Sequence, residues 1–595
     1  MKKTIVRRGG DSSDSALVLA ERNGGEYNGG EQGLEALIQM LYRHRGVKSD
    51  TQNNCSQQYS LQKILRPDTL LGLEAAIDIL VAALMAQEKI VVVGDFDADG
   101  ATSTALAVSC LHAFGFRHVD YLVPNRFEFG YGLTPEIVEV TTSLSPNIII
   151  TVDNGISSID GVAYAKSKGY KVIVTDHHLP GRETPDADAI VNPNQRGCPF
   201  PSKHLAGVGV IFYLMSALRS ALRKMNWFEK KAIPEPSMGQ YLDLVALGTV
   251  ADVVPLDYNN RILVAAGLRK MRSGNALPGI QALLSIAAKD AKSIGASDLG
   301  FAVGPRLNAA GRLDDMSLGI RCLLSVGIAE ALEYARELDD LNRDRKLIES
   351  SMQVEAQKIL DETLAAAALD TGVSGVCLYK DDWHQGVIGI LASRIKDAVH
   401  RPTIIFAKTE SGELKGSGRS IGGVHLRDVL DEIATQNPGL IEKFGGHAMA
   451  AGMSLVESRL ENFKRLFDAC VKRHLTDENA KPVVFSDGQL PEALLTLATA
   501  TAIREAGPWG QHFPEPTFDG VFYIVQQRIV GGKHLKLMLS AEPYSNLVFD
   551  AIAFNIDAAQ WPNPELREMH IAYKLDINEY RGNKNVQLLV DYIDV

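Results

Sequence analysis

Four short apolar runs, separated by helical stretches, constrain the fold of this chain more than any other feature. They are Ile90–Val93, Val119–Val123, Asn147–Val152 and Lys171–Thr175. Strands that alternate with helices indicate βαβ units and a parallel sheet. The runs are continuously rich in apolar residues rather than alternating, as in strands covered on both faces. The first large part of the chain is therefore predicted to be an α/β domain.

An acidic run, GDFDADG, follows the first of these strands directly and carries Asp95, Asp97 and Asp99. Open α/β sheets bind ligands just outside the carboxyl ends of their strands. Alternate residues of an extended segment point the same way, so we expect the three carboxylates to converge. They would repel one another unless a divalent cation lay between them. Thr102 or Ser103 is expected to cap the helix that follows.

The same acidic run resembles the start of a calcium-binding EF-hand loop. Such a loop requires a glutamate at its twelfth position, where this chain has Leu106. An EF-hand loop also follows a helix, whereas this run follows a strand. Both differences argue against a calcium loop.

Three further segments place acids or histidines at the ends of other elements. TVDNGIS carries Asp153 after a strand, TDHH carries His177 and His178 after another, and ALGTVADVV carries Asp252 after an apolar helical run. A single aspartate at a strand end is usually a helix cap, but four such sites on successive elements are hard to explain as caps. Carboxylates together with imidazole favour Mn²⁺ or Mg²⁺ over zinc.

The order of the four motifs is similar to that of the DHH phosphoesterase superfamily, named after the triplet found here as Asp176, His177 and His178. Within it the chain resembles the RecJ family over nearly all of its length beyond residue 60. The resemblance implies a single-stranded-DNA-specific exonuclease that works 5′→3′ in recombination and repair. It also implies two-metal hydrolysis of phosphodiester bonds with release of 5′-mononucleotides.

The resemblance implies that two ions of Mn²⁺ or Mg²⁺ share one ligand, Asp153. One of these ions would also be bound by Asp95 and Asp97. Pyrophosphatases of the superfamily have a histidine upstream of their paired aspartates, where this chain offers Asp95. That position is therefore the one at which the chain departs from part of the superfamily.

The second ion would be bound by Asp99, His177 and Asp252 as well as by the shared aspartate. His178 would face the scissile phosphate. The residues predicted to be catalytic are Asp97, Asp99, Asp153 and His178.

Two further segments are predicted to bind the nucleic acid. FAVGPRLNAAGRLDD resembles the motif that closes the catalytic region of the RecJ family, and it carries Arg306, Asn308 and Arg312. PNRFEFGYGL places Arg126 among aromatic residues. Arginine presents a planar fork matched to phosphate oxygens, and aromatic rings suit stacked bases. Aromatic packing within a loop is the alternative for the second segment.

A second α/β block begins at residue 374 and contains WHQGVIGILASRI, KGSGRS and FGGHAMAAG. These segments are similar to the DHHA1 domain of the superfamily. Glycines let backbone N–H groups approach an anion closely. Ser417, Arg419 and His447 are therefore predicted to bind a phosphate near the 5′ end of the substrate.

The chain has 595 residues, which is too long for one hydrophobic core. The predicted fold class is α/β, with a parallel-sheet domain joined by a long helix to a second α/β domain and followed by a β-barrel, which the resemblance implies is OB-like. The predicted parts are an N-terminal arm over residues 1–60 around a helix at Leu34–His44, a DHH catalytic domain over 61–324, a connecting helix over 325–365, a DHHA1 domain over 366–470 and a nucleic-acid-binding barrel over 471–595.

The net charge of −11 argues weakly against nucleic-acid binding, because phosphates are neutralised by Lys and Arg. Binding depends on where charges lie rather than on their sum, and metal sites need acids. Six scattered cysteines without a CxxC pair favour a reduced, cytoplasmic protein. No apolar run approaches the ~18–20 residues that span a bilayer, so no membrane association is expected.

The resemblance implies a monomer whose partners are single-stranded DNA, a single-strand-binding protein and a RecQ-type helicase. Two alternatives stay open. One is a DHH phosphoesterase for pyrophosphate, short oligonucleotides or cyclic dinucleotides, against which the long C-terminal extension argues. The other is a non-catalytic binding module or replication scaffold, against which the presence of every expected ligand argues.

Overall fold

The computed structural model describes residues 2–9, 31–47, 59–125, 129, 131–367, 373–543, 545–557, 560–580 and 582–594. The chain divides into two compact units. The first, which we call the parallel-sheet unit, comprises Glu31–Asn342 and Thr501–Glu515. The second, the barrel unit, comprises Met1–Gly30, Arg343–Ala500 and Pro516–Val595.

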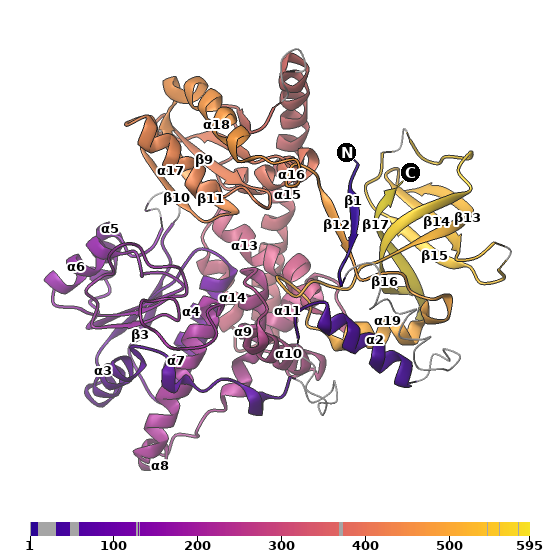
Figure 1. Ribbon diagram of the computed structural model, residues 1–595. Helices are drawn as coiled ribbons and strands as arrows, with labels where there is room; N and C mark the ends of the chain where they lie inside the picture. Colours follow the sequence, from indigo (N-terminus) through magenta and orange to yellow (C-terminus); the bar gives the residue numbers. More distant parts are fainter. Residues whose placement is uncertain are drawn as a thin grey trace. The chain divides into compact units, whose positions relative to one another are not determined.

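A five-stranded sheet forms the framework of the parallel-sheet unit (Figure 1). Its strand order is β3-β2-β4-β5-β6, and every neighbouring pair is parallel. The four predicted strands are present, with ends that shift by at most one residue, and β6 was not predicted. The strands are β2 (Ile90–Val93), β3 (Val119–Leu122), β4 (Ile148–Val152), β5 (Lys171–Thr175) and β6 (Ala189–Val191).

Helices account for most of the remainder of this unit. The predicted helix of the N-terminal arm is present as α2, and a π-helical turn, η6, precedes α13. The helices are α2 (Glu31–Arg43), α3 (Leu73–Ala86), α4 (Ala98–Phe114), α5 (Pro135–Thr142), α6 (Ile159–Ser167), α7 (Gly207–Lys224), α8 (Trp227–Lys231), α9 (Leu242–Ala251), α10 (Tyr258–Arg272), α11 (Pro278–Ile286), α12 (Ala296–Asp298), η6 (Leu299–Val303), α13 (Gly304–Leu313) and α14 (Ser317–Leu324).

Helices cover both faces of the parallel sheet. On one face, Val91, Ile149 and Val172 share an apolar cluster with side chains of α5 and α6. Helices α4 and α7 also contact the strands, and every residue of β2 and β4 is buried. The unbroken apolar runs in the sequence follow from this double cover.

The barrel unit contains a mixed sheet with the order β10-β11-β9-β8-β7, in which only β7 and β8 pair in parallel among the described strands. Side chains of α17 and α18 share its apolar cluster. The elements are β7 (Val376–Tyr379), α16 (Ile388–Val399), β8 (Thr403–Lys408), β9 (Glu413–Arg419), α17 (Leu426–Gln436), β10 (Lys443–Gly446), β11 (Ala450–Val456) and α18 (Leu460–His474).

The C-terminal strands close into a barrel with the order β13-β14-β15-β17-β16. Strands β15 and β17 pair in parallel and the other neighbours in the ladder pair antiparallel. Five strands in a Greek-key barrel are the mark of an OB fold, so the predicted OB-like barrel is confirmed. The strands are β13 (Phe518–Val530), β14 (His534–Ser540), β15 (Phe549–Ala553), β16 (Glu568–Tyr580) and β17 (Asn583–Asp594).

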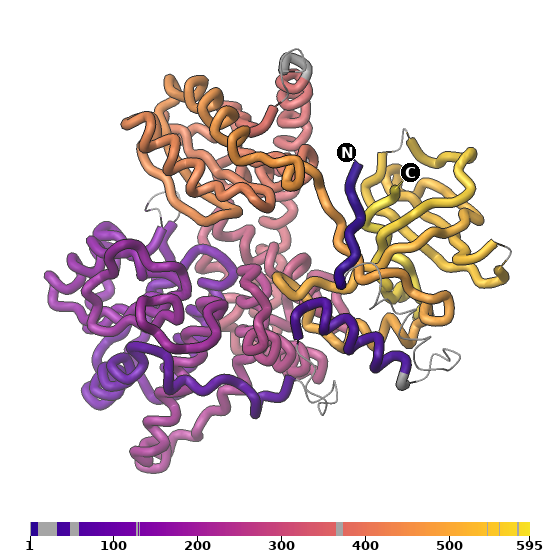
Figure 2. Tube along the Cα trace, in the orientation of Figure 1, coloured from indigo at the N-terminus to yellow at the C-terminus, as the bar shows by residue number. Residues whose placement is uncertain are grey.

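The N-terminal arm contributes a strand that the sequence did not predict. Strand β1 (Thr4–Arg7) pairs in parallel with β12 (Val483–Ser486), and Figure 2 shows the two running side by side. Arg7 binds the buried carboxylate of Asp519 with N···O distances of 3.0 and 2.7 Å. The first residues of the chain are therefore fastened to the barrel unit rather than irregular.

A single helix, α15 (Ile328–Ala367), occupies the stretch predicted as a connecting helix over 325–365. Helix α19 (Leu497–Ala506) follows β12.

No single helix among the described residues is long and apolar enough to cross a membrane; one bent pair, Leu61–Thr69 with Leu73–Ala86, passes on length and composition alone. The limits of the five predicted parts stay predictions.

Candidate metal centre and phosphate-binding residues

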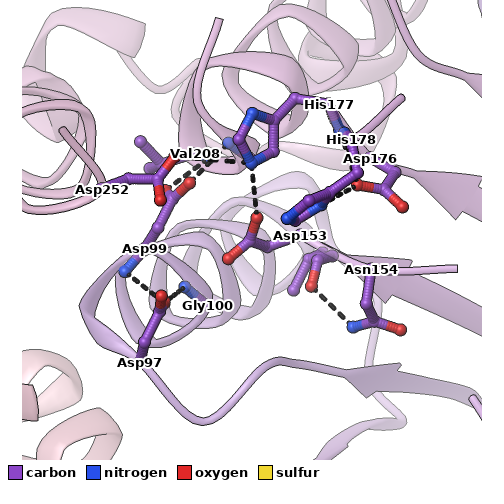
Figure 3. A network of polar contacts seen from close by, with 12 residues as sticks. Asp97, Asp99, Gly100, Asp153, Asn154, Asp176, His177, His178, Val208 and Asp252 are labelled. Carbon is purple, nitrogen blue, oxygen red and sulfur yellow. Dashed lines mark hydrogen bonds and ion pairs between the residues drawn. The ribbon is translucent and has the colours of Figure 1, made fainter. Parts of the chain in front are cut away.

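Asp97 starts the helix that follows the first strand of the acidic edge. It is the N-cap of α4, and its Oδ1 accepts hydrogen bonds from the backbone N–H groups of Asp99 (2.9 Å) and Gly100 (3.0 Å) (Figure 3). The expectation that Thr102 or Ser103 caps this helix was wrong, because both lie inside it and Thr102 donates to carbonyls of its first turn. An aspartate at the extended residue before the helix reaches the free N–H groups first.

Six predicted ligands lie together at the carboxyl edge of the parallel sheet, in two groups. Within each group the potential ligand atoms lie within 4.8 Å of one another. The groups are Asp95, Asp97 and Asp153, and Asp99, His177 and Asp252. The resemblance implied the same two groups with Asp153 added to the second, and metal binding by these residues stays a prediction.

His177 connects the groups. Its Nε2 lies 3.1 Å from Oδ1 of Asp153 and 3.5 Å from Oδ2 of Asp252, and Figure 3 shows its ring between the two carboxylates. Asp153 is therefore next to both groups, as a shared ligand must be. The expected reason for convergence needs correction, since the acidic run is not extended throughout: Asp99 lies in the first turn of α4 and points into the other group from Asp97.

The N-terminus of α7 holds Asp99 in place. The backbone N–H of Gly207 donates to Oδ2 (2.6 Å) and that of Val208 to Oδ1 (2.9 Å). Free N–H groups at a helix N-terminus favour a carboxylate. A side chain at Gly207 would place its Cβ 2.6 Å from Cβ of Asp153, so only glycine fits between the helix and the end of β4. The sequence indicated a close helix–strand approach here, but not that it supports the acidic cluster.

Burial and mutual repulsion disfavour the ionised form of the carboxylates in the centre. Burial, followed by the charge of Asp97, raises the pKa of Asp99 to about 7. Burial and the neighbouring carboxylates raise the pKa values of Asp153 and Asp252 well above the usual range. The buried Oδ1 of Asp153 accepts no hydrogen bond from the described residues. This donor set fits hard divalent cations such as Mn²⁺ or Mg²⁺, which would offset the repulsion.

The first residue of the DHH triplet orients the third. Asp176 accepts a hydrogen bond from Nδ1 of His178 (2.7 Å) and another from the backbone N–H of Ile156 (2.9 Å). Burial alone would lower the pKa of His178, but Asp176 and nearby carboxylates outweigh it and raise the pKa to about 9. Sequence reasoning named Asp176 only as part of the triplet and did not predict that it orients His178. The triplet itself was the feature that could have indicated this role.

Tyr131 is a second residue that sequence reasoning did not assign to the centre. Its hydroxyl donates to the backbone carbonyl of Asp153 (3.1 Å) and lies 3.2 Å from Nδ1 of His178. Its ring packs edge-on against that of Phe96. In the sequence, Phe96 lies between the candidate ligands Asp95 and Asp97. The aromatic segment that contains Tyr131 was expected to contact bases; Arg126 of the same segment lies outside the described residues.

Two side chains of the segment FAVGPRLNAAGRLDD make bonds within the protein that were not expected. Arg306 pairs with Asp339 through Nε and Nη2 at 2.9 and 2.8 Å and donates from Nη1 to the carbonyl of Ala302. Oδ1 of Asn308 accepts from the backbone N–H of Ala98 (2.8 Å) at the start of α4. These two side chains serve the protein itself, while Arg312 lies in the last turn of α13. Phosphate binding by all three stays a prediction.

The glycines of KGSGRS do not form the expected anion loop. The segment lies in strand β9, where Ser417 and Arg419 share one face. A Cβ at Gly416 would lie 2.6 Å from the Phe406 ring and one at Gly418 2.7 Å from Leu426, so core packing requires these glycines.

The two predicted phosphate ligands of β9 nevertheless lie together. Nη1 of Arg419 is 3.3 Å from Oγ of Ser417, and Gly389 at the start of α16 lies against both side chains. Arg419 pairs with Ala450 across the strands, which places it beside the turn that carries His447. Burial lowers the pKa of Arg419, and no carboxylate of the described residues pairs with it. A half-buried cation without an acidic partner suits an anionic ligand.

Three family models match successive parts of the chain. They are described as the DHH family, N-terminal domain (residues 89–249), the DHHA1 domain (370–473) and the RecJ OB domain (486–592). The "Single-stranded-DNA-specific exonuclease RecJ" of Dickeya dadantii (strain 3937) is 54% identical over 94% of this chain and 96% of its own length. The protein of the same name from Escherichia coli (strain K12) is 53% identical over 100% of both chains.

The chain belongs to the RecJ family. Solved structures of the family share its fold. RecJ from Thermus thermophilus in complex with Mn²⁺ matches with a TM-score of 0.75 and 29% identity, over 94% of this chain and 76% of that one. The complex of the same protein with Mg²⁺ matches with a TM-score of 0.70 and 27% identity, over 94% and 75%. The predicted fold class is thus that of the RecJ family.

Proposed function

We propose that this protein is a metal-dependent exonuclease that degrades single-stranded DNA in the 5′→3′ direction and releases 5′-mononucleotides. The observation that carries the proposal is the convergence of five carboxylates and one imidazole in two ligand groups that meet at Asp153. The names of the RecJ relatives, and the Mn²⁺ and Mg²⁺ complexes of the Thermus protein, support both the substrate and the cofactor.

Two ions of Mn²⁺ or Mg²⁺ would be held by the two groups. Asp95 and Asp97 would bind one, Asp99, His177 and Asp252 the other, and Asp153 both. Bound ions of this kind neutralise charge on a phosphate and lower the pKa of water, which supplies the nucleophile. Strand β4 places this shared ligand at the edge of the sheet, because Asp153 directly follows its last residue.

The chain's own residues then hold the substrate and its charge. His178, oriented by its hydrogen bond to Asp176, would donate a hydrogen bond to a phosphate oxygen on which negative charge develops. Arg419, Ser417 and His447 would bind the terminal phosphate. The barrel would bind further phosphates and bases of the strand, as OB folds do.

The cellular setting follows from the family resemblance. We infer that the enzyme acts in recombination and repair in the cytoplasm, as a monomer, on strands that a RecQ-type helicase and a single-strand-binding protein supply. The division into an arm, a catalytic DHH domain, a connecting helix, a DHHA1 domain and a barrel belongs to the same proposal.

Digestion of end-labelled strands tests the function directly. A 5′-labelled single strand should release labelled mononucleotide at once with Mn²⁺, a 3′-labelled strand should release its label last, and blunt duplex should resist. EDTA should stop both reactions. Early release of the 3′ label would overturn the polarity. Rapid hydrolysis of dinucleotides or pyrophosphate with no attack on long strands would favour the small-substrate alternative.

A further inference from the structure

One aromatic side chain of the parallel-sheet unit is almost fully exposed. Phe301 is 87% exposed and lies in the π-helical turn η6, which continues into α13. An exposed phenyl ring forgoes the free energy that burial would give. Single π-helical turns are rare and occur frequently at functional sites. Both features indicate a ring that contacts a ligand.

The turn that carries Phe301 rests on the helix that delivers a candidate metal ligand. A Cβ at Gly300 would lie 3.4 Å from Cγ1 of Val250, and one at Gly304 would lie 3.2 Å from Cβ of Ala251. These two contacts are made with the two residues that come directly before Asp252. The backbone on both sides of Phe301 is therefore fixed against the edge of the metal centre.

Two other exposed apolar side chains directly follow residues of the centre in the sequence. Val253 directly follows Asp252, Leu179 directly follows His178, and each is 60% exposed. Val253 also has a φ of 61°, a left-handed conformation that is strained for a β-branched residue. Strained residues of this kind cluster at functional sites. We call Leu179, Val253 and Phe301 the apolar rim.

We propose that Phe301 stacks on a base of the single strand and so positions the strand at the metal centre, with Val253 and Leu179 as apolar contacts beside it. The inference rests on the proposed function. A single strand offers flat, unpaired base faces next to each phosphate, and stacking on an aromatic ring accepts any base. Paired bases inside a duplex are covered by their neighbours. The rim thus selects single strands without reading sequence.

Strand binding with and without bases tests the proposal. In an Asp153→Ala background, which prevents turnover, Phe301→Ala should raise the Kd for a 5′-phosphorylated single strand about 5- to 100-fold, the range for loss of one base–aromatic stack. Phe301→Trp should retain binding. A single abasic site should be moved through the first nucleotides of the strand. At one position the abasic site should weaken strand binding by the parent protein and leave strand binding by Phe301→Ala unchanged.

Val326→Ala is the matched control, because Val326 is 94% exposed in the same unit but lies in the loop between α14 and α15. It should bind like the parent. Equal Kd values for Phe301→Ala and the parent, or an equal loss for every abasic strand, would overturn the proposal. A lower melting temperature without weaker DNA binding would also overturn it, since the ring would then pack against protein. Absence of any binding or degradation of single strands by the unaltered protein would instead reject the proposed function.

Discussion

At the scale of single residues, the centre trades stability for the ability to bind metal. Asp153 is buried, has a left-handed backbone (φ 63°) and lies beside carboxylates that raise its pKa. Asp153→Asn keeps the shape and removes the charge. We expect it to lower the exonuclease rate more than about a hundredfold, the scale of losing one electrostatic contact in an active site. In EDTA it should melt at the same temperature as the parent or higher, because the repulsion is gone.

Initial rates with Mn²⁺ and melting curves in EDTA measure both effects. Asp186→Asn, which removes an exposed acid of the same unit, serves as the control. A variant that is active, or that melts well below the parent without metal, would contradict the role of Asp153.

The half-buried cation of β9 gives a second prediction at this scale. Arg419→Ala should weaken degradation of 5′-phosphorylated strands roughly tenfold to a hundredfold, since a charged hydrogen bond contributes ~1.5–3 kcal/mol. Strands with a 5′-hydroxyl should be affected less. Steady-state kinetics on the two substrates checks this. An equal loss on both would make Arg419 a general backbone contact or a structural residue.

At the scale of elements, the start of α7 is the part of the fold on which the centre depends most. Gly207 fits where a Cβ would overlap Asp153, and its N–H binds Asp99. Gly207→Ala should therefore move both ligands, lower Mn²⁺ affinity and activity, and cost ~1–3 kcal/mol of stability through overpacking.

Gly209→Ala is the matched control, because Gly209 lies in the same first turn of α7 as Gly207. Its Cβ would meet only the flexible end of Leu205 at 3.1 Å, and alanine favours a helix over glycine. Isothermal titration with Mn²⁺ and chemical denaturation compare the two variants. Equal behaviour would mean that the helix start adapts without disturbing the ligands.

At the scale of the whole molecule, the acids of the centre link metal binding, pH and stability. Burial and the charge of Asp97 raise the pKa of Asp99 to about 7 in the folded, metal-free protein, whereas its ordinary pKa of 3.8 applies when the chain is unfolded. The folded state then holds more protons than the unfolded state, so the contribution of this group falls as pH rises from about 4 to 7. Asp153 and Asp252 act in the same direction.

Bound metal should cancel this loss. The rise in melting temperature on adding Mn²⁺ should be small at pH 5 and larger at pH 8. When free Mn²⁺ is at a hundred times its Kd, the free energy of unfolding should rise by ~2.7 kcal/mol. Differential scanning calorimetry with and without EDTA across this range gives the answer. A metal-induced shift that does not change with pH would count against the acidic cluster.

The sequence by itself determined where the chemistry lies. Four apolar runs, three of them followed by acids, predict a parallel sheet with carboxylates at one edge, because parallel strands end on the same side. Local periodicity carries that information. It gave no sign of β1, whose partner β12 lies far away along the chain, since pairing between distant strands has no local pattern.

The tertiary structure decided which contact each side chain makes. Asp97 caps α4 as well as joining the centre, Arg306 pairs with Asp339, and Gly207 admits α7 to the end of β4. The same glycine spacing that suggested an anion loop in KGSGRS instead permits packing beneath β9. A residue type limits which bonds are chemically available, whereas only the neighbours brought together by folding determine which of those bonds form.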